Sequence, residues 1–158
     1  MPEALVLGAT GFIGGQIARA AAAQGYTISG LRRRNNAVGS IQDLAITWYD
    51  GSLSNQKSLE KALEGKDLVF HAAGFYPPDN DFTKTPQYLK QAEDQINTFL
   101  EAVCSSRVQK LIYTSSLTTI GHPPAGESRL ADERDRYLPG TLPDNAYYEA
   151  KILMEDRV

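Results

Sequence analysis

LVLGATGFIGG, residues Leu5 to Gly15, joins a short apolar run to a helical pattern through a turn that is rich in glycine. The run at residues 4–7 has the composition of a buried strand and ends at Gly8. The stretch 12–24 is rich in alanine, carries apolar residues at helical spacing and is terminated by Gly25. We therefore expect a strand, a tight turn and a helix, the unit from which α/β sheets are built.

The same alternation continues along the chain. Continuously apolar runs between helical patterns indicate the strands of a parallel sheet that is covered on both faces. With right-handed crossovers and a chain that doubles back after the third strand, the predicted strand order is 3-2-1-4-5, a doubly wound Rossmann-type α/β fold. Ligands of such sheets bind at the carboxyl ends of the strands. Further strands are expected at residues 26–31, 45–49, 67–73 and 110–115, and helices at 55–64, at 86–106 and after Asp144, which is expected to cap the last helix.

The composition excludes several classes of protein. The chain has 158 residues, which suits one domain, and its net charge of −3 offers no basic surface for nucleic acid. The single cysteine, Cys104, and two histidines, His71 and His122, predict neither a disulfide framework nor a metal site. No membrane-spanning run and no secretion signal are visible, so we expect no membrane partner and a cytoplasmic location.

The glycine turn has a chemical use as well as a conformational one. Its spacing is Gly-x-x-Gly-x-x-Gly, one residue longer than the common dinucleotide fingerprint. Glycine lets the backbone turn tightly and approach a pyrophosphate, and the following helix offers unpaired N–H groups to the phosphates. Glycine can also serve only to turn a chain, but its place at the first strand–helix turn favours a dinucleotide site. The residues expected to bind the cofactor here are Gly8, Thr10, Gly11, Phe12, Ile13 and Gly14.

The second strand lacks the acidic residue that marks a site for NAD. Such a site places Asp or Glu at the strand end, where it binds the ribose hydroxyls. Here the strand ends at Leu31, and Arg32-Arg33-Arg34 follows. Guanidinium groups pair well with phosphate, so Arg32 and Arg33 favour NADP, whose 2′-phosphate would lie there. The alternative is a solvated charged loop. We expect NADPH to bind at least an order of magnitude more tightly than NADH.

A tyrosine and a lysine close to residue 158 have the spacing of a catalytic pair. Tyr147 and Lys151 are four residues apart, so their side chains share one face of a helix. The pKa of a free tyrosine is near ~10, and a neighbouring ammonium lowers it, so that the phenol can exchange a proton with a carbonyl oxygen. This spacing is common by chance. Its weight comes from the glycine turn and from the hydroxyls of Thr114, Ser115 and Ser116 after the fifth strand.

The combined motifs resemble a known family. The stretches LVLGATGFIGGQIA, LVFHAAG, LIYTSSLTTIG, LADE and NAYYEAKILMED resemble the extended short-chain dehydrogenases/reductases, also called the NAD-dependent epimerase/dehydratase family. Within it, GLRRR, HAAGFY and YTSSLTTIG are most similar to the dihydroflavonol reductase-like and hopanoid-associated sugar epimerase-like branch.

The resemblance implies a role for each matching residue. Ser116 would polarise the substrate oxygen, with Thr114 or Ser115 nearby, and Tyr147 would be the acid-base. Lys151 would hold the nicotinamide ribose and lower the pKa of Tyr147. Tyr148 is the competing tyrosine, but the family spacing selects Tyr147. The residues expected to line the cofactor cleft after the fourth strand are Ala72, Ala73 and Gly74, whereas the lone His71 is expected to be structural.

The chain also departs from the family pattern. Ser52 stands where the family has an aspartate that contacts the adenine, with Asp50 as a substitute that the sequence leaves open. Gln91 and Asp94 stand where a helix of the family has its Asn-x-x-Gly motif. Family members are about twice as long, so the chain is expected to be a fragment that lacks the substrate-binding part. The loop at 117–145 is expected to form one wall of a substrate site.

Three functions are consistent with these features. The first is an NADP-dependent oxidoreductase that reduces a ketone or aldehyde with Ser/Tyr/Lys chemistry. The second is a nucleotide-sugar epimerase or dehydratase that keeps NAD tightly bound. The third is a dinucleotide-sensing module without activity, which the retained Tyr147 and Lys151 disfavour. The expected partner is a small carbonyl compound or a sugar nucleotide, and a homodimer is compatible with this picture.

Overall fold

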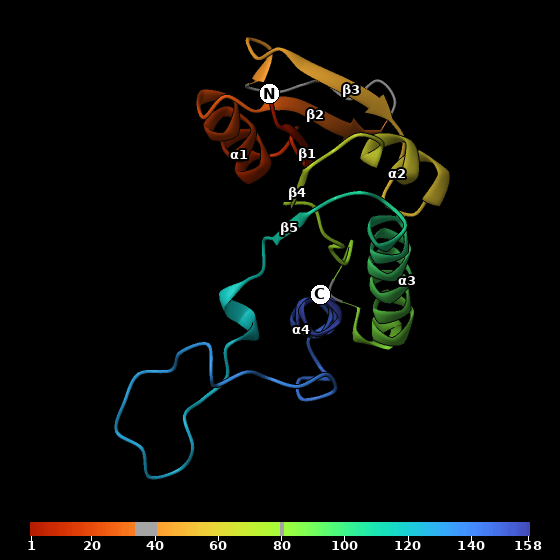
Figure 1. Ribbon diagram of the computed structural model, residues 1–158. Coiled ribbons are helices and arrows are strands. Elements are labelled where there is room, and N and C mark those ends of the chain that lie inside the picture. Colours follow the sequence, from red (N-terminus) through yellow and green to blue (C-terminus); the bar gives the residue numbers. More distant parts are fainter. Residues whose placement is uncertain (34–40, 80) are drawn as a thin grey trace. The chain divides into compact units, whose positions relative to one another are not determined.

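The computed structural model of the protein describes residues 1–33, 41–79 and 81–158 (Figure 1). These residues form two compact units, which are described separately. The first unit contains residues 1–74 and 97–114, and the second contains residues 75–96 and 115–158. Arg34, one of the three arginines predicted to follow the second strand, lies outside the described residues.

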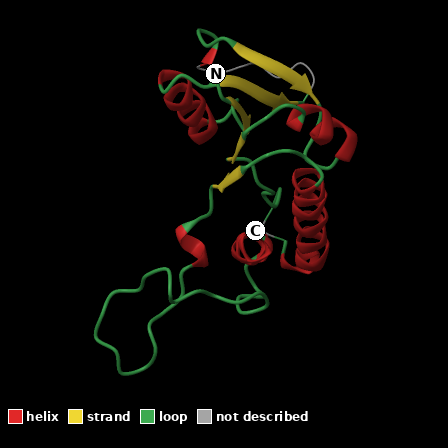
Figure 2. Ribbon diagram, in the orientation of Figure 1, coloured by secondary structure: helices red, strands yellow, loops and turns green. Residues whose placement is uncertain are grey.

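A five-stranded parallel sheet forms the first unit, and its order, β3-β2-β1-β4-β5, is the predicted one. Its register pairs Leu7 at the end of β1 with Leu31 of β2 and His71 of β4, so these strand ends share one edge of the sheet. The strands of this unit are drawn as arrows in Figure 2. The strands are β1 (Glu3–Leu7), β2 (Thr27–Arg32), β3 (Ile46–Asp50), β4 (Leu68–His71) and β5 (Lys110–Tyr113).

Helices bury both faces of this sheet, as the continuously apolar strands predict. Alternate residues of a strand point to opposite faces. Ala4 and Val6 of β1 pack in a cluster with Ala18 and Ala21 of α1 (Phe12–Ala23). The odd-numbered residues of these strands point to the other face and are buried as well; they include Leu5, Leu7, Val69 and His71. The amphipathic α2 (Gln56–Leu63) buries Leu59, Ala62 and Leu63, and Figure 1 shows α1 and α2 flanking the strands.

The fourth and fifth strands are shorter than the apolar runs suggest. The predicted strands extend to Ala73 and Ser115, but the observed ones end at His71 and Tyr113. The N–H of Ala72 still donates to the carbonyl of Leu7 at 3.0 Å, and the N–H of Thr114 donates to the carbonyl of His71 at 2.9 Å. Beyond these bonds the chain leaves the ladder, so Ala73 and Ser115 belong to loops.

The second unit is built mainly from helices and one long loop. Its elements are η2 (Phe82–Lys84), the first part of α3 (Thr85–Cys104), η3 (Leu117–Thr119) and α4 (Ala146–Arg157). The predicted cap of α4 was wrong by one residue, because Asn145 and not Asp144 is the N-cap. The Asn145 side chain accepts from the N–H of Tyr148 at 3.1 Å, a bond that fixes the first turn.

The loop at 117–145 is irregular, as expected, but it is held by specific bonds. Arg129 forms two hydrogen bonds of 2.6 Å with the carboxylate of Asp135. An isolated antiparallel bridge joins Ile120 to Arg136. Glu149 of α4, only 1% exposed, accepts hydrogen bonds from two backbone N–H groups of the loop, those of Gly140 and Leu142. The loop is therefore anchored to the helix that carries Tyr147 and Lys151.

Candidate active site and cofactor loop

The glycine turn of the first unit has the geometry that the sequence predicts. Gly8 has a φ of +87°, a conformation that residues with a Cβ rarely adopt. The N–H of Gly11 donates to the carbonyl of Gly8 at 2.9 Å and closes the turn. A Cβ on Gly14 would lie 2.1 Å from that carbonyl oxygen, so α1 begins directly against the turn. Glycine is required at both Gly8 and Gly14, for different reasons.

The start of α1 is suited to an anion. Gly11 is the N-cap and has no side chain that could accept from the first-turn N–H groups. Such N–H groups, together with the helix dipole, attract phosphate. Phe12 and Ile13 are exposed, with 85% and 53% of their surface accessible, and Thr10 is half-buried. The turn thus leaves its backbone accessible where a pyrophosphate is expected.

The loop after β4 lies against this turn. A Cβ on Gly8 would lie 2.8 Å from the carbonyl oxygen of Ala72 and 3.0 Å from the nitrogen of Ala73. The structure therefore brings Ala72 and Ala73 to the glycine turn. Gly74, the last residue of this unit before the chain passes to Phe75, is half-buried.

At the end of β2, Arg32 is ion-paired whereas Arg33 is exposed to solvent. Arg32 is the last residue of β2, not the first of a loop, and is paired in register with Asp50 of β3. Its Nε lies 3.3 Å from Asp50 Oδ1, and its guanidinium lies 5.2 Å from the centre of the Trp48 ring. Arg33 follows and is exposed. This ion pair was not predicted from the sequence, although the strand order places β2 beside β3.

Ser52 is held by the start of α2. Its N–H donates to the Oγ of Ser58 at 3.2 Å, and that hydroxyl in turn donates to the carbonyl of Ser52. Asp50 is exposed and is the partner of Arg32. Gln91 and Asp94 stand at the family's Asn-x-x-Gly positions. Gln91 is exposed, and the Asp94 carboxylate accepts a hydrogen bond of 3.1 Å from the Lys90 ammonium.

The predicted catalytic residues gather in the second unit. Tyr147 and Lys151 lie one turn apart on α4, and the Lys151 Nζ is 5.9 Å from the centre of the Tyr147 ring. Lys151 is buried, with 6% of its surface exposed. Ser116 precedes η3, where its Oγ accepts from the N–H and the hydroxyl of Thr118 at 3.3 Å and 3.0 Å. A hydroxyl that accepts two bonds still has its own proton to donate.

The surroundings of Tyr147 favour its ionised form. Burial raises its pKa, but hydrogen bonding with Tyr76 and Ser116 and the charge of Lys151 outweigh burial, so the pKa of Tyr147 is lowered. Burial lowers the pKa of Lys151, and the nearby Tyr147 opposes that shift. Ser116 and Lys151 therefore both lower the pKa of Tyr147.

The neighbouring hydroxyls and His71 have other contacts. Ser115 donates to the carboxylate of Glu155 on α4. Tyr148, the competing tyrosine, contacts the Tyr147 ring edge-on at 5.9 Å between ring centres and is more exposed than Tyr147. His71 is fully buried in the first unit and packs against Phe99 with 4.5 Å between ring centres. That packing agrees with the structural role expected of His71.

Tyr76 is a neighbour of Tyr147 that was not predicted from the sequence. Tyr76 follows β4, is 64% exposed and stacks on the Tyr147 ring with 5.1 Å between centres and 27° between planes. The Lys151 Nζ lies 4.9 Å from the centre of the Tyr76 ring. Its place after a strand end was the only available signal, because it lies 71 positions before Tyr147 in the sequence.

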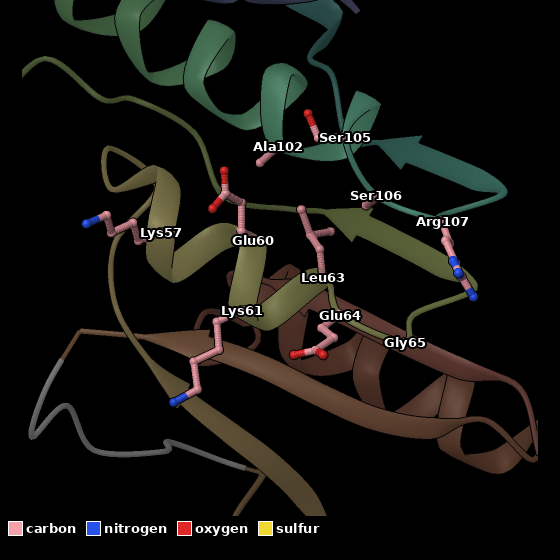
Figure 3. A pocket seen from close by; sticks show the side chains of 10 residues that line it. All are labelled: Lys57, Glu60, Lys61, Leu63, Glu64, Gly65, Ala102, Ser105, Ser106 and Arg107. Carbon is pink, nitrogen blue, oxygen red and sulfur yellow. The ribbon is translucent and has the colours of Figure 1, made fainter.

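Two hollows differ in their relation to these residues. The larger hollow, of about 830 Å³, lies between α2 and the end of α3 (Figure 3). Its lining contains both basic and acidic side chains among uncharged ones. Gly65 and Arg107 line it and precede β4 and β5, so it lies at the amino edge of the sheet, opposite the edge where such sheets bind ligands. The smaller, of about 250 Å³, belongs to the second unit and reaches Tyr147. It is lined by Pro77, Asp79, Asp81, Phe82, Asn145, Ala146 and Tyr147.

The described residues contain neither a candidate metal site nor a membrane-spanning helix. Among the described residues, no group of three or more His, Cys, Asp or Glu side chains could hold a metal ion. Within the same part of the chain, no helix has the length and apolar character needed to cross a membrane.

Known proteins resemble the chain over most of its length. The 2-alkyl-3-oxoalkanoate reductase of Shewanella oneidensis is 30% identical over 159 residues, which cover 97% of this chain and 37% of that protein. The dihydroflavonol 4-reductase of Callistephus chinensis is 27% identical over 130 residues, 75% of this chain and 35% of that protein. This match confirms the predicted likeness to dihydroflavonol reductases.

Solved structures agree with this assignment. The crystal structure of vestitone reductase from alfalfa is 26% identical, matches with a TM-score of 0.76 and covers 99% of this chain and 51% of that one. The chain thus spans between about a third and a half of the length of these relatives. The model of the NAD dependent epimerase/dehydratase family matches residues 4–158. The chain therefore belongs to the NAD dependent epimerase/dehydratase family, whose members include reductases and epimerases.

Proposed function

We propose that the protein reduces a ketone or aldehyde by hydride transfer from NADPH, with Ser116, Tyr147 and Lys151 as its catalytic residues. The observation that carries the proposal is the gathering of Ser116 and Lys151 around a tyrosine whose pKa is lowered. A tyrosine in such surroundings is suited to proton transfer near neutral pH. The similarity to a 2-alkyl-3-oxoalkanoate reductase supports a carbonyl substrate.

The residues of this chain would divide the work between them. The turn at Gly8 to Gly14 fits a pyrophosphate, because its helix start is uncapped and its glycines leave no room for a Cβ. When bound, the nicotinamide supplies the hydride. Tyr147 then gives its proton to the substrate oxygen, Ser116 donates a hydrogen bond to that oxygen, and Lys151 stabilises the phenolate that remains.

The preference for NADP rests on the end of β2. Arg32 and Arg33 are the described cations there, and no acidic residue of β2 itself is in reach of a ribose. A 2′-phosphate would take the place of the Asp50 carboxylate as the partner of Arg32, since its two negative charges pair more strongly with a guanidinium than one does.

The Arg32–Asp50 ion pair also supports a second candidate function, an epimerase or dehydratase with tightly bound NAD. Asp50 already neutralises Arg32 at 3.3 Å, so the β2 end is less positive than its sequence implies. In this case the substrate alcohol would first be oxidised, so Tyr147 would take up its hydroxyl proton and give it back when the hydride returns to the same substrate. The family contains such enzymes.

Nucleotide binding and turnover test the two candidates. The reductase proposal expects NADPH to bind at least ~10-fold more tightly than NADH in a fluorescence titration. Equal affinities would remove the argument from Arg32 and Arg33, and NAD that copurifies with the protein would favour the epimerase. Tyr147→Phe should abolish turnover and Tyr148→Phe should retain it. Unchanged turnover in Tyr147→Phe would refute the catalytic assignment under either candidate.

A further inference from the structure

Tyr76 has contacts that packing alone does not explain. Its ring stacks on Tyr147, and the Lys151 ammonium lies 4.9 Å from its ring centre, so both neighbours are proposed catalytic residues. All three residues belong to the second unit. A side chain that stays 64% exposed buries too little apolar surface to contribute much to folding. The contacts of Tyr76 therefore indicate a role in the chemistry of the site.

We propose that Tyr76 is a positioning residue for proton transfer, whose hydroxyl donates a hydrogen bond to the Tyr147 oxygen and so stabilises the phenolate. The inference rests on the proposed function, because it presupposes that Tyr147 is the acid-base. Tyr76 itself need not touch the substrate. It acts through Tyr147, as a second donor beside Ser116 in the substrate-free site and as the remaining donor when Ser116 bonds the substrate oxygen.

The electrostatics of the pair agree with this direction of donation. Hydrogen bonding with Tyr147 is the largest cause of a raised pKa at Tyr76, whereas hydrogen bonding with Tyr76 and Ser116 lowers the pKa of Tyr147. Of the two phenols, Tyr147 therefore ionises first, and Tyr76 keeps its proton for donation. A phenolate with two donors and a neighbouring ammonium is stabilised at each side.

The ring of Tyr76 also stabilises the charge of the buried Lys151 ammonium. Burial lowers the pKa of Lys151 and so disfavours the charge that Tyr147 needs beside it. The face of an aromatic ring attracts an ammonium, and the Lys151 Nζ lies over the rings of both Tyr76 and Tyr147. Stacking on Tyr147 thus places the Tyr76 ring beside both the phenol and the ammonium of the pair.

The titration of Tyr147 in the cofactor-free protein tests the proposal. Tyrosines labelled with carbon-13 at Cζ are followed by NMR from pH 7 to pH 12, and Tyr147→Phe identifies the Tyr147 signal. Tyr76→Phe keeps the ring and removes only the hydroxyl. The pKa of Tyr147 should then rise by about one unit, a tenfold change in proton affinity. Tyr148→Phe is the matched control, because Tyr148 also contacts the Tyr147 ring. It should shift that pKa by less than about 0.2 units.

Two outcomes would overturn the proposal. One is a Tyr147 pKa that stays unchanged in Tyr76→Phe. The other is an equal shift in Tyr76→Phe and Tyr148→Phe, which would show a general loosening of the helix. The experiment needs neither substrate nor cofactor, so it is separate from the test of catalysis by Tyr147→Phe. In an active enzyme, Tyr76→Phe should also move the alkaline limb of the pH–rate profile upward by the same amount, since reduction needs protonated Tyr147.

Discussion

Replacing Gly14 by alanine should damage the glycine turn more than any other single methyl group added there. The new Cβ would lie 2.1 Å from the carbonyl oxygen of Gly8, whereas ordinary contact begins at 3.4 Å. Its other close neighbours are the Gly8 carbon at 2.5 Å and the Ala9 nitrogen at 2.9 Å. All three are backbone atoms, so no side chain can rotate out of the way. The start of α1 must move away from β1 by about 1 Å.

The expected loss of stability follows from two opposing effects. Overpacking of this kind costs about 3 kcal/mol at the upper end of its range, while alanine is better than glycine inside a helix by about 1 kcal/mol. We therefore expect Gly14→Ala to lower the free energy of unfolding by about 2 kcal/mol. With a urea dependence of about 2 kcal/mol per molar, the unfolding midpoint falls by about 1 M. Trp48, the only tryptophan, reports the transition by its fluorescence.

Gly11→Ala is the matched control, because the same Gly8 oxygen lies near its Cβ. Here the distance is 3.3 Å and the backbone φ is −89°, which alanine adopts readily. It should lose less than half as much stability as Gly14→Ala. A shift of about 1 Å also removes the N–H groups of α1 from a bound pyrophosphate, so dinucleotide affinity should fall at least ~10-fold in Gly14→Ala. A Gly14→Ala protein as stable as the wild type, or no less stable than Gly11→Ala, would refute the close approach of helix and turn.

Three further predictions follow from the ion pairs and the buried glutamate. Asp50→Asn frees Arg32, so NADPH should bind several-fold more tightly in a fluorescence titration while NADH changes little. Glu149→Ala leaves two backbone N–H groups of the loop without their acceptor and should cost about 2 kcal/mol, measured by urea unfolding, with a smaller loss in Glu149→Gln. Hydrogen bonding with Arg129 lowers the pKa of Asp135 in the folded protein, so this pair stabilises the fold above the ordinary Asp pKa of ~3.9 and ceases to do so as the pH falls through the lowered value. The melting temperature of Asp135→Asn should accordingly lie below that of the wild type at pH 6, and the difference should shrink towards pH 2; a constant difference would contradict the linkage.

The fold could be predicted because each of its signals is local. An apolar run such as residues 4–7 is buried on both faces only in a covered parallel sheet, and the helix after Gly11 is fixed by periodicity. Strand ends were less certain, because Ala72 and Ala73 are apolar enough to continue β4 although the ladder stops at His71. Likewise Asp144 and Asn145 are both good caps, and only backbone geometry decides between them.

The contacts between distant residues could not be predicted in the same way. The Arg32–Asp50 pair follows from the register of β2 and β3, which the strand order alone leaves open by one or two residues. No spacing rule connects Tyr76 with Tyr147, since one follows a strand and the other begins a helix. Sequence patterns therefore identified the residues that a family shares, whereas the residues that tune them came from the structure.

The division of the chain into two units makes the proposed cofactor loop and the proposed proton donor separately testable. Gly8, Gly11 and Gly14 belong to the first unit, whereas Tyr76 and Tyr147 belong to the second. Without cofactor, the contacts that lower the pKa of Tyr147 all come from the second unit. Gly14→Ala should therefore weaken dinucleotide binding and leave the titration of Tyr147 unchanged. Tyr76→Phe should raise the pKa of Tyr147 and leave dinucleotide binding unchanged, because the lost hydroxyl acts on Tyr147 and on no part of the glycine turn. A variant of one unit that altered the readout of the other would refute this separate assignment of dinucleotide binding and of Tyr147 ionisation.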